Sequence, residues 1–142
     1  MIKYKLLKTK LPLIARILLG LVFFASGWVG LLNLYPMPPN LPERLVAFNA
    51  GLIATGYFFP FLKITEIVCG FLLLSGVFVP LALVVLAPIV LNIFLVHAFL
   101  APSGLPLAIV LGLLLSYLAF FAEPYSAVVK QIFRCPKREV HG

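Results

Sequence analysis

The residues that could do chemistry in this sequence are a few polar side chains within or beside long apolar stretches. They are Ser26, Asn33, Lys63, Glu66, Asn92 and His97. A glutamate and a histidine could relay a proton, and the whole group could hold the polar head of a ligand through hydrogen bonds. A carboxyl group in hydrocarbon is strongly destabilised unless it is paired or protonated, so we expect Glu66 to face protein.

These side chains do not form a catalytic or metal-binding motif. One histidine and one glutamate fall short of the three or four ligands of the usual metal sites. The sequence has no Ser-His-Asp set, phosphate loop, dinucleotide fingerprint or haem-attachment motif. Cys69 and Cys135 form no Cys-x-x-Cys pair, and we interpret Cys69 as a packing residue. We predict no catalytic residue and no metal site in this chain alone. Whether it serves as a subunit of an enzyme stays open.

The stretch between Glu66 and Glu123 determines the architecture. From 67 to 122 the chain carries no Lys, Arg, Asp or Glu. As one helix this run would extend roughly 84 Å at about 1.5 Å per residue. The hydrocarbon core of a bilayer is only about 30 Å thick, so the run must fold back on itself. Pro80 and the Ala-Pro-Ser-Gly-Leu-Pro segment at 101–106 supply the breaks, because proline interrupts helices.

The composition predicts an integral membrane protein with an all-α fold. Of the 142 residues, 63% are hydrophobic and only 11% are charged, too few to cover the surface of a soluble domain. Continuous rather than alternating apolar runs disfavour a β-barrel. The first run resembles a signal peptide at its start but continues past Gly27, so we interpret it as a retained helix. We expect one domain, a four-helix bundle with spans at about 11–34, 60–79, 81–100 and 105–122, followed by a cytoplasmic tail at 123–142.

The segment between the first two spans predicts an additional short helix on the outer face. Residues 36–42 contain four prolines and read as an extended connector. Residues 43–59 are apolar but too short to span comfortably, and we expect an interfacial or re-entrant helix that caps the bundle. Its small residues recur at helical spacing, which suits close helix contact; they are Ala47, Ala50, Gly51 and Ala54.

The net charge of +7 is explained by membrane topology rather than by nucleic acid. The basic residues gather before the first span and after the last: Lys3, Lys5, Lys8, Lys10, Arg16, Lys130, Arg134, Lys137 and Arg138. Because basic residues concentrate on the cytoplasmic side, both termini are predicted to be cytoplasmic, in contact with anionic lipid. We expect no nucleic-acid partner.

This topology brings the polar residues toward the outer half of the bundle. Each of them also allows a simpler interpretation than ligand binding. Lys63 and Glu66 are three apart, so they could form a local ion pair, or Lys63 could extend outward and leave Glu66 to another partner. Asn92 could join helices, and His97 could hydrogen-bond at the interface. Ser26, Gly30 and Asn33 share one helix face, which suits packing as well as binding. Asn33, Lys63, Glu66 and His97 are expected at one depth, with Ser26 and Asn92 deeper.

Three segments between about Ala15 and Phe133 resemble the DoxX-like family of small four-helix bacterial membrane proteins. They are Arg-Ile-Leu-Leu-Gly-Leu-Val-Phe-Phe-Ala-Ser-Gly at 16–27, Lys-Ile-Thr-Glu-Ile-Val-Cys-Gly-Phe-Leu-Leu-Leu-Ser-Gly at 63–76, and the segment at 87–104. The third is the most specific, since it places Asn92 and His97 after a proline. Many relatives carry a Gly-Lys pair where this chain has Val29-Gly30. If that lysine pairs with the acid of the second span in relatives, Glu66 here must depend on Lys63, on His97 or on protonation instead.

The resemblance implies a multi-pass protein of the bacterial cytoplasmic membrane that is associated with redox systems. One relative is a subunit of a thiosulfate:quinone oxidoreductase. Our leading hypothesis is therefore an accessory subunit whose polar cluster binds a quinone, together with a redox partner protein or a second copy of the chain. The alternatives are a small proton-linked transporter or permease, in which Glu66 cycles its proton, and a structural membrane anchor or assembly factor.

Overall fold

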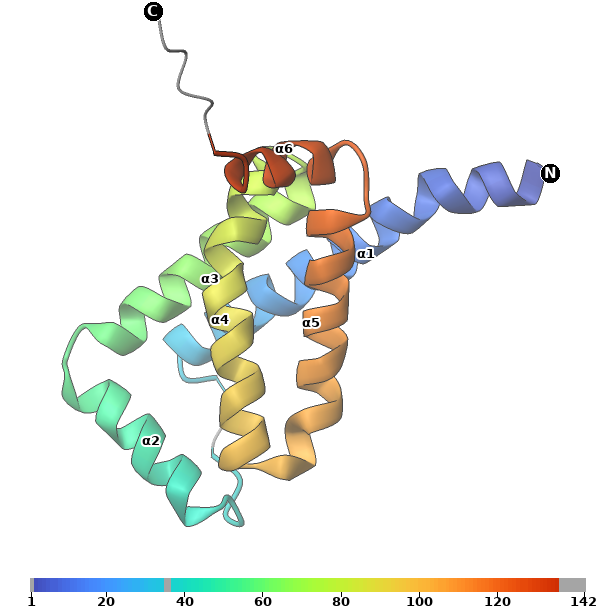
Figure 1. The fold of residues 1–142 in the computed structure, drawn as a ribbon. Coiled ribbons are helices and arrows are strands. Elements are labelled where there is room, and N and C mark those ends of the chain that lie inside the picture. Colours follow the sequence, from blue (N-terminus) through green and yellow to red (C-terminus); the bar gives the residue numbers. More distant parts are fainter. Residues whose placement is uncertain (1, 35–36, 136–142) are drawn as a thin grey trace, which may run out of the picture.

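A computed structural model describes residues 2–34 and 37–135, and it is helical throughout those ranges apart from turns and connectors (Figure 1). Its elements follow in the order α1 (Ile2–Leu31), α2 (Glu43–Ala54), α3 (Phe58–Ser75), α4 (Val79–Phe99), the 3-10 turn η1 (Pro102–Gly104), α5 (Leu105–Phe120) and α6 (Tyr125–Ile132). Among the residues described, four segments are long and apolar enough to cross a membrane: Ile2–Leu31, Phe58–Ser75, Val79–Phe99 and Pro102–Phe120. The all-α fold with four membrane-spanning helices is confirmed.

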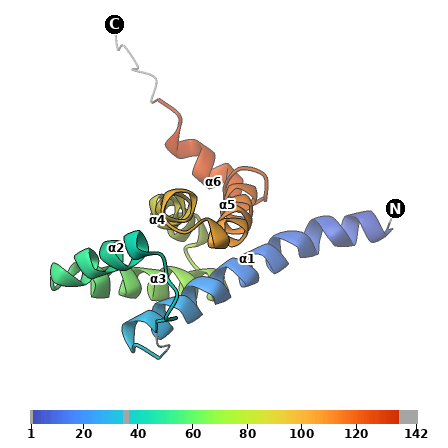
Figure 2. The same cartoon turned by 90° about the horizontal axis from the view of Figure 1, so that it is seen from below.

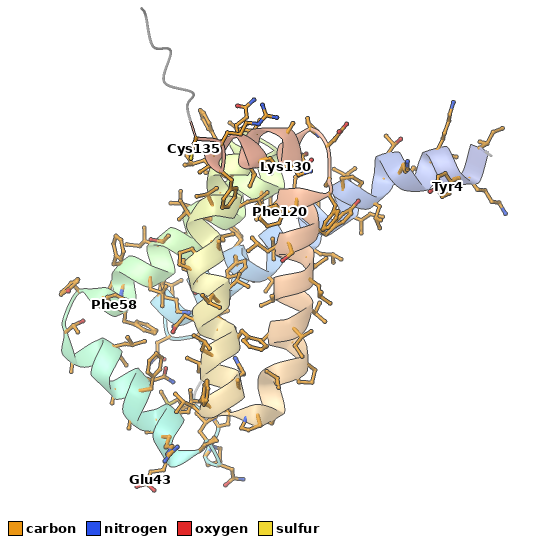
Figure 3. The ribbon with its side chains drawn as sticks, in the orientation of Figure 1. Tyr4, Glu43, Phe58, Phe120, Lys130 and Cys135 are labelled. Carbon is orange, nitrogen blue, oxygen red and sulfur yellow. The ribbon has the colours of Figure 1, made fainter. Side chains whose placement is uncertain are left out.

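The long helices form two antiparallel pairs. The most extensive contact joins α1 to α3, and the next joins α4 to α5. In both views the α1–α3 pair crosses the α4–α5 pair at a steep angle (Figures 1 and 2). The pairs meet near α6, and they separate toward α2. We call these ends the α6 side and the α2 side; Lys130 marks the first and Glu43 the second (Figure 3).

Glycine lets α1 and α3 approach until their backbones touch. A Cβ atom at Gly70 would lie 2.5 Å from the backbone nitrogen of Phe24 and 2.8 Å from the carbonyl oxygen of Gly20. Small residues allow such approach between membrane helices, where association depends on van der Waals packing rather than on the hydrophobic effect. Buried apolar side chains of these two helices, such as Ala15, Leu19 and Leu73, lie toward the α6 side of this contact.

The Arg16 side chain links three segments on the α6 side of the molecule. Gly76 ends α3 in the left-handed conformation, with φ of 78°, and its N–H donates to the Leu72 carbonyl. The Arg16 guanidinium packs against Gly76, and its Nη1 donates to the Tyr125 hydroxyl over 3.0 Å. A positive charge at a helix C-terminus is favourable because the macrodipole is negative there. Arg16 thus connects α1 with the α3–α4 turn and with α6.

Two segments differ from the sequence-based expectation. The first span was expected to begin near residue 11, but α1 begins at Ile2, since lysine and leucine favour helix and Pro12 removes a single hydrogen bond. The expected tail contains α6, which packs on α4 and α5 through Ser126 and Val129. Residues 36 and 136–142, which belong to the expected connector and tail, lie outside the described ranges.

The short helix α2 is present but packs loosely. It ends at Ala54 rather than at 59, because Thr55, Gly56 and Tyr57 turn the chain into α3. Among the described residues it contacts α3, and it buries none of its own side chains. A Cβ atom at Gly51 would meet nothing within 4 Å. The expected close helix contact along the small-residue stripe is therefore wrong at Gly51, and α2 leaves the α2 side open.

The close backbone contact at Gly70 predicts that adding one methyl group there destabilises the protein. Gly70→Ala should destabilise the protein by about 1–3 kcal/mol, because its Cβ would overlap backbone atoms that cannot rotate away. Gly112→Ala is the matched control, since a Cβ there meets nothing within 4 Å and alanine favours helix. Thermal unfolding in detergent measures both. Equal melting temperatures for the two variants would contradict the close α1–α3 contact.

The Arg16 contact predicts a second loss of stability. Tyr125→Phe should reduce the free energy of unfolding by about 1–3 kcal/mol, because it removes the acceptor of a charged donor whose Nε is already buried without a partner in the described structure. Tyr57→Phe serves as the control, because Tyr57 is exposed and makes no side-chain hydrogen bond within the described residues. Denaturant titration followed by circular dichroism compares them, and an unaffected Tyr125→Phe would argue against the anchor.

Candidate functional site

The centre of the candidate site is an ion pair within α3. Lys63 and Glu66 stand one turn apart, and the Lys63 Nζ lies 3.1 Å from the Glu66 Oε2. Glu66 is only 3% exposed, and Lys63 is largely covered. Of the two roles expected for Lys63, local pairing with Glu66 is confirmed. Because both residues belong to one helix, the pair forms wherever α3 forms.

Helix α1 supplies the wall against which this pair lies. A Cβ atom at Gly30 would stand 2.6 Å from the Lys63 Cε, and one at Gly27 would stand 2.9 Å from the Lys63 carbonyl oxygen. The two glycines therefore leave the space that the lysine stem occupies. The Ser26 hydroxyl lies near the Glu66 carboxyl. The Lys63 ammonium also lies 5.6 Å from the centre of the Phe59 ring, a cation–π contact.

The pair has hydrogen-bonding capacity that it does not use internally. A lysine ammonium carries three N–H donors, and Glu66 accepts one of them. Lys63 bonds one of the two carboxyl oxygens, Oε2. The charges cancel, which reduces the cost of placing them in an apolar span. The arrangement can donate hydrogen bonds to an acceptor, and its carboxylate can accept a proton, which would leave the pair with a net positive charge.

Asn33 does not share the helix face that was predicted for it. Helix α1 ends at Leu31, and Asn33 adopts a left-handed conformation with φ of 52°. Its N–H donates to the Gly30 carbonyl over 3.4 Å, and the residue is exposed. Asparagine tolerates the left-handed region better than most residues, so it terminates the helix instead of extending it. Ser26 and Gly30 remain on α1 beside Lys63 and Glu66.

Asn92 and His97 lie on α4, in the other helix pair. Asn92 is exposed. The His97 Nδ1 lies 2.7 Å from the Ile93 carbonyl oxygen; because a carbonyl can only accept, this nitrogen carries a proton and donates. A Cβ atom at Gly104 would overlap the His97 ring, so the imidazole packs on η1. Within the described residues no hydrogen bond or ion pair joins either side chain to Lys63 or Glu66.

The structure thus brings together Ser26, Lys63 and Glu66, and it places Asn92 and His97 apart from them. Sequence reasoning missed one member of the site, Phe59. Phe59 stands four residues before Lys63, one turn away on the same face, which is a readable signal. Gly30 was predicted to share a helix face with Ser26, but the space that it leaves for Lys63 is identified only once α1 is known to pack on α3. Cys69 is buried and Cys135 exposed, and both are free. No metal-binding group of His, Cys, Asp or Glu occurs among the residues described.

A comparison with models of known protein families identifies the family of this chain. The family model named DoxX matches residues 11–98. The chain belongs to the DoxX family. The match covers most of α1, then α2 and α3, and nearly all of α4, so it includes every candidate residue discussed above. No curated protein matches the chain, and no solved structure does.

Of the partners considered for Glu66, the structure supplies Lys63, which belongs to the same helix. Gly30 stands on α1, and the Lys63 stem fills the space beside it. The acid on α3 therefore obtains its positive partner from α3 itself.

Removing one charge should harm the protein more than removing both. Lys63→Gln leaves the buried Glu66 carboxyl without its cation, and we expect a loss of up to about 3 kcal/mol of unfolding free energy. Lys63→Gln combined with Glu66→Gln keeps similar side-chain shapes without charge, and should recover most of that loss. Thermal unfolding at neutral pH compares the two proteins. A double variant as unstable as the single one would show that the ion pair is not what stabilises this region.

Proposed function

We propose that this DoxX protein is an accessory, non-catalytic membrane subunit of a redox system, and that Lys63 and Glu66 hold the polar head of a quinone. The observation that carries the proposal is a buried ion pair, with unused donors, inside an apolar membrane-spanning helix. Ionisable residues are rare within membrane spans, and they commonly mark ligand or proton sites.

The ion pair is not explained by helix packing alone. It lies between two residues of α3, so it connects no two elements, in contrast to the bond between Arg16 and Tyr125. Apolar side chains of similar volume often match or exceed the stability that a buried ion pair contributes. A function beyond packing therefore accounts for a pair that the fold does not require.

The residues present fit a quinone head. A quinone offers carbonyl oxygens as acceptors, and the Lys63 ammonium has two N–H donors beyond the one that Glu66 accepts. The Phe59 ring beside Lys63 offers an apolar surface for a flat ring. When bound, a quinone would supply two-electron, two-proton redox chemistry. In this proposal Lys63 orients a carbonyl oxygen, and the Glu66 carboxyl, with Ser26 beside it, takes up or releases a proton.

A partner for this subunit is suggested by Asn92. Its amide is exposed in the middle of α4, where a membrane span would otherwise place it against hydrocarbon. Polar side chains in membrane helices are commonly satisfied by hydrogen bonds across helix contacts. We therefore assign Asn92 to the contact with a redox partner protein or with a second copy of this chain.

The orientation belongs to the same proposal. The described basic residues at the start of α1 and in α6 lie on the α6 side, as do Tyr4 and Lys130 in Figure 3. Since basic residues concentrate on the cytoplasmic face, we assign the α6 side to the cytoplasmic side of a bacterial inner membrane. The Lys63–Glu66 pair then lies in the outer half of the bilayer.

Trp28 reports directly on this site. It is the only tryptophan in the chain, and it follows Gly27, which contacts Ile67 and Lys63. A short-chain quinone titrated into the protein in detergent should quench Trp28 fluorescence with saturation. In the double Lys63→Gln, Glu66→Gln variant the dissociation constant should rise about tenfold, which corresponds to the loss of one charge-assisted hydrogen bond.

Lys130→Gln is the matched control, because it removes a lysine from the other end of the molecule, and it should leave the titration unchanged. Quenching that rises linearly with quinone, and equally in all three proteins, would show partition into the micelle and would reject the binding site. Proton-coupled flux in proteoliposomes, abolished by Glu66→Gln without quinone, would favour the transporter. Altered stability alone would favour a structural anchor.

A further inference from the structure

A cavity lies on the α6 side, away from the ion pair, between the start of α1 and the end of α5. Its volume is about 770 Å³, and it is the most polar of the cavities described in this molecule. Its walls include Tyr4, Lys8, Pro12, Tyr117, Phe121 and Glu123. Cavities of this size are large enough for a small ligand or for a lipid head group. Neither the family relationship nor the proposed quinone site accounts for it.

The polar cavity continues into an apolar groove. A groove of about 380 Å³ between α1 and α5 is lined by Leu11, Ala15, Val110, Leu113, Leu114 and Tyr117. Leu11 and Tyr117 line both spaces, so the two are contiguous. The groove runs along two membrane-spanning helices, whereas the polar cavity lies at their ends. A ligand that fills both must be polar at one end and apolar at the other.

The cavity offers charges of both signs. Lys8 and Glu123 are exposed, and neither forms an ion pair within the described part of the chain. Lys8 lies over the Tyr4 ring, with its Nζ 5.5 Å from the ring centre. Pro12 has no N–H, so the helix cannot supply the usual donor to the Lys8 carbonyl oxygen, four residues earlier. The cavity is therefore lined by one cation that can bind an anion and one carboxylate that can bind a cation, and the Lys8 carbonyl oxygen at its edge lacks its usual helix donor.

We propose that this cavity binds one phospholipid whose head group carries a phosphate and a primary ammonium. Lys8 contacts the phosphate, Glu123 and the Lys8 carbonyl accept from the ammonium, and an acyl chain follows the groove between α1 and α5. The carboxylate disfavours a purely anionic head, while a quaternary ammonium has no N–H to donate. The lipid belongs to the leaflet on the α6 side, roughly 33 Å along α1 from Gly30. The proposal is thus independent of the quinone site.

Native mass spectrometry of the intact chain tests this selectivity. The protein in mild detergent is mixed with equal amounts of phosphatidylethanolamine, phosphatidylcholine and phosphatidylglycerol with identical acyl chains. We expect one retained phosphatidylethanolamine per chain, in excess over the other two. Preferential retention of phosphatidylglycerol, or equal retention of all three, would overturn the proposal. So would a lipid-free dimer, which would show that a second copy covers this surface.

The variants separate the roles of the two charges and the groove. Glu123→Gln should reduce the preference for phosphatidylethanolamine about tenfold, the equivalent of one charge-assisted hydrogen bond. Lys8→Gln should weaken retention of all three lipids, and Leu113→Trp should do the same by filling the groove. Lys130→Gln and Glu43→Gln make the same charge changes away from the cavity and should behave as the wild type. If Glu123→Gln and Lys8→Gln also match the wild type, the site is rejected.

Two further measurements exclude simpler explanations. Each variant should melt within a few degrees of the wild type without added lipid, so that altered retention reflects the cavity and not unfolding. Soluble glycerophosphoethanolamine, the head group without acyl chains, should fail to displace the bound lipid at millimolar concentration. Displacement by the free head group would show that the groove contributes nothing and that the ligand is not a lipid.

Discussion

The contact of α1 with α3 is the constraint on which the rest of this structure depends. In a membrane the hydrophobic effect does not press helices together, so a pair must gain its stability from close van der Waals contact and from polar groups. Gly70 against Phe24, and Gly20 against Leu73, provide that contact at the level of the backbone. The same approach sets Gly30 beside Lys63 and brings Arg16 onto Gly76. The candidate site and the anchor near α6 are both consequences of one helix register.

Buried side chains are distributed unevenly along the molecule. The buried apolar side chains of all four long helices, with Val129 of α6, form one core toward the α6 side. Toward the α2 side the pairs diverge, and α2 contacts α3 without burying any side chain of its own (Figures 1 and 2). The ion pair of Lys63 and Glu66 lies on α3 beyond the main core, on the side where the two helix pairs diverge. Polar groups at such a place can meet a ligand or a partner, while the core keeps the scaffold fixed.

Sequence reasoning succeeded where a feature depends on neighbours in the chain. Hydropathy located the four spans, because each must match the bilayer with a continuous apolar run. The pairing of Lys63 with Glu66 was readable because residues three apart meet on any helix. The family resemblance was confirmed over 11–98.

What escaped prediction depends on helix rotation and on long-range pairing. No local signal states that α1 packs on α3, or that the Asn92 side chain points away from the helices around it. Asn33 was placed on a helix face because the apolar pattern continues through it, yet its left-handed backbone ends α1 earlier. Helix α6 escaped because its eight residues are fewer than the roughly 11–18 over which helical periodicity is judged, although the helix itself is amphipathic.

The bond between Arg16 and Tyr125 has a consequence for how the protein is made. Its two residues are separated by 109 positions, so the acceptor leaves the ribosome long after the first helix has entered the membrane. Until then Arg16 lacks this hydrogen-bond acceptor. The bond can therefore form only after α6 has been synthesised, so the link between α1 and α6 belongs to a late stage of folding.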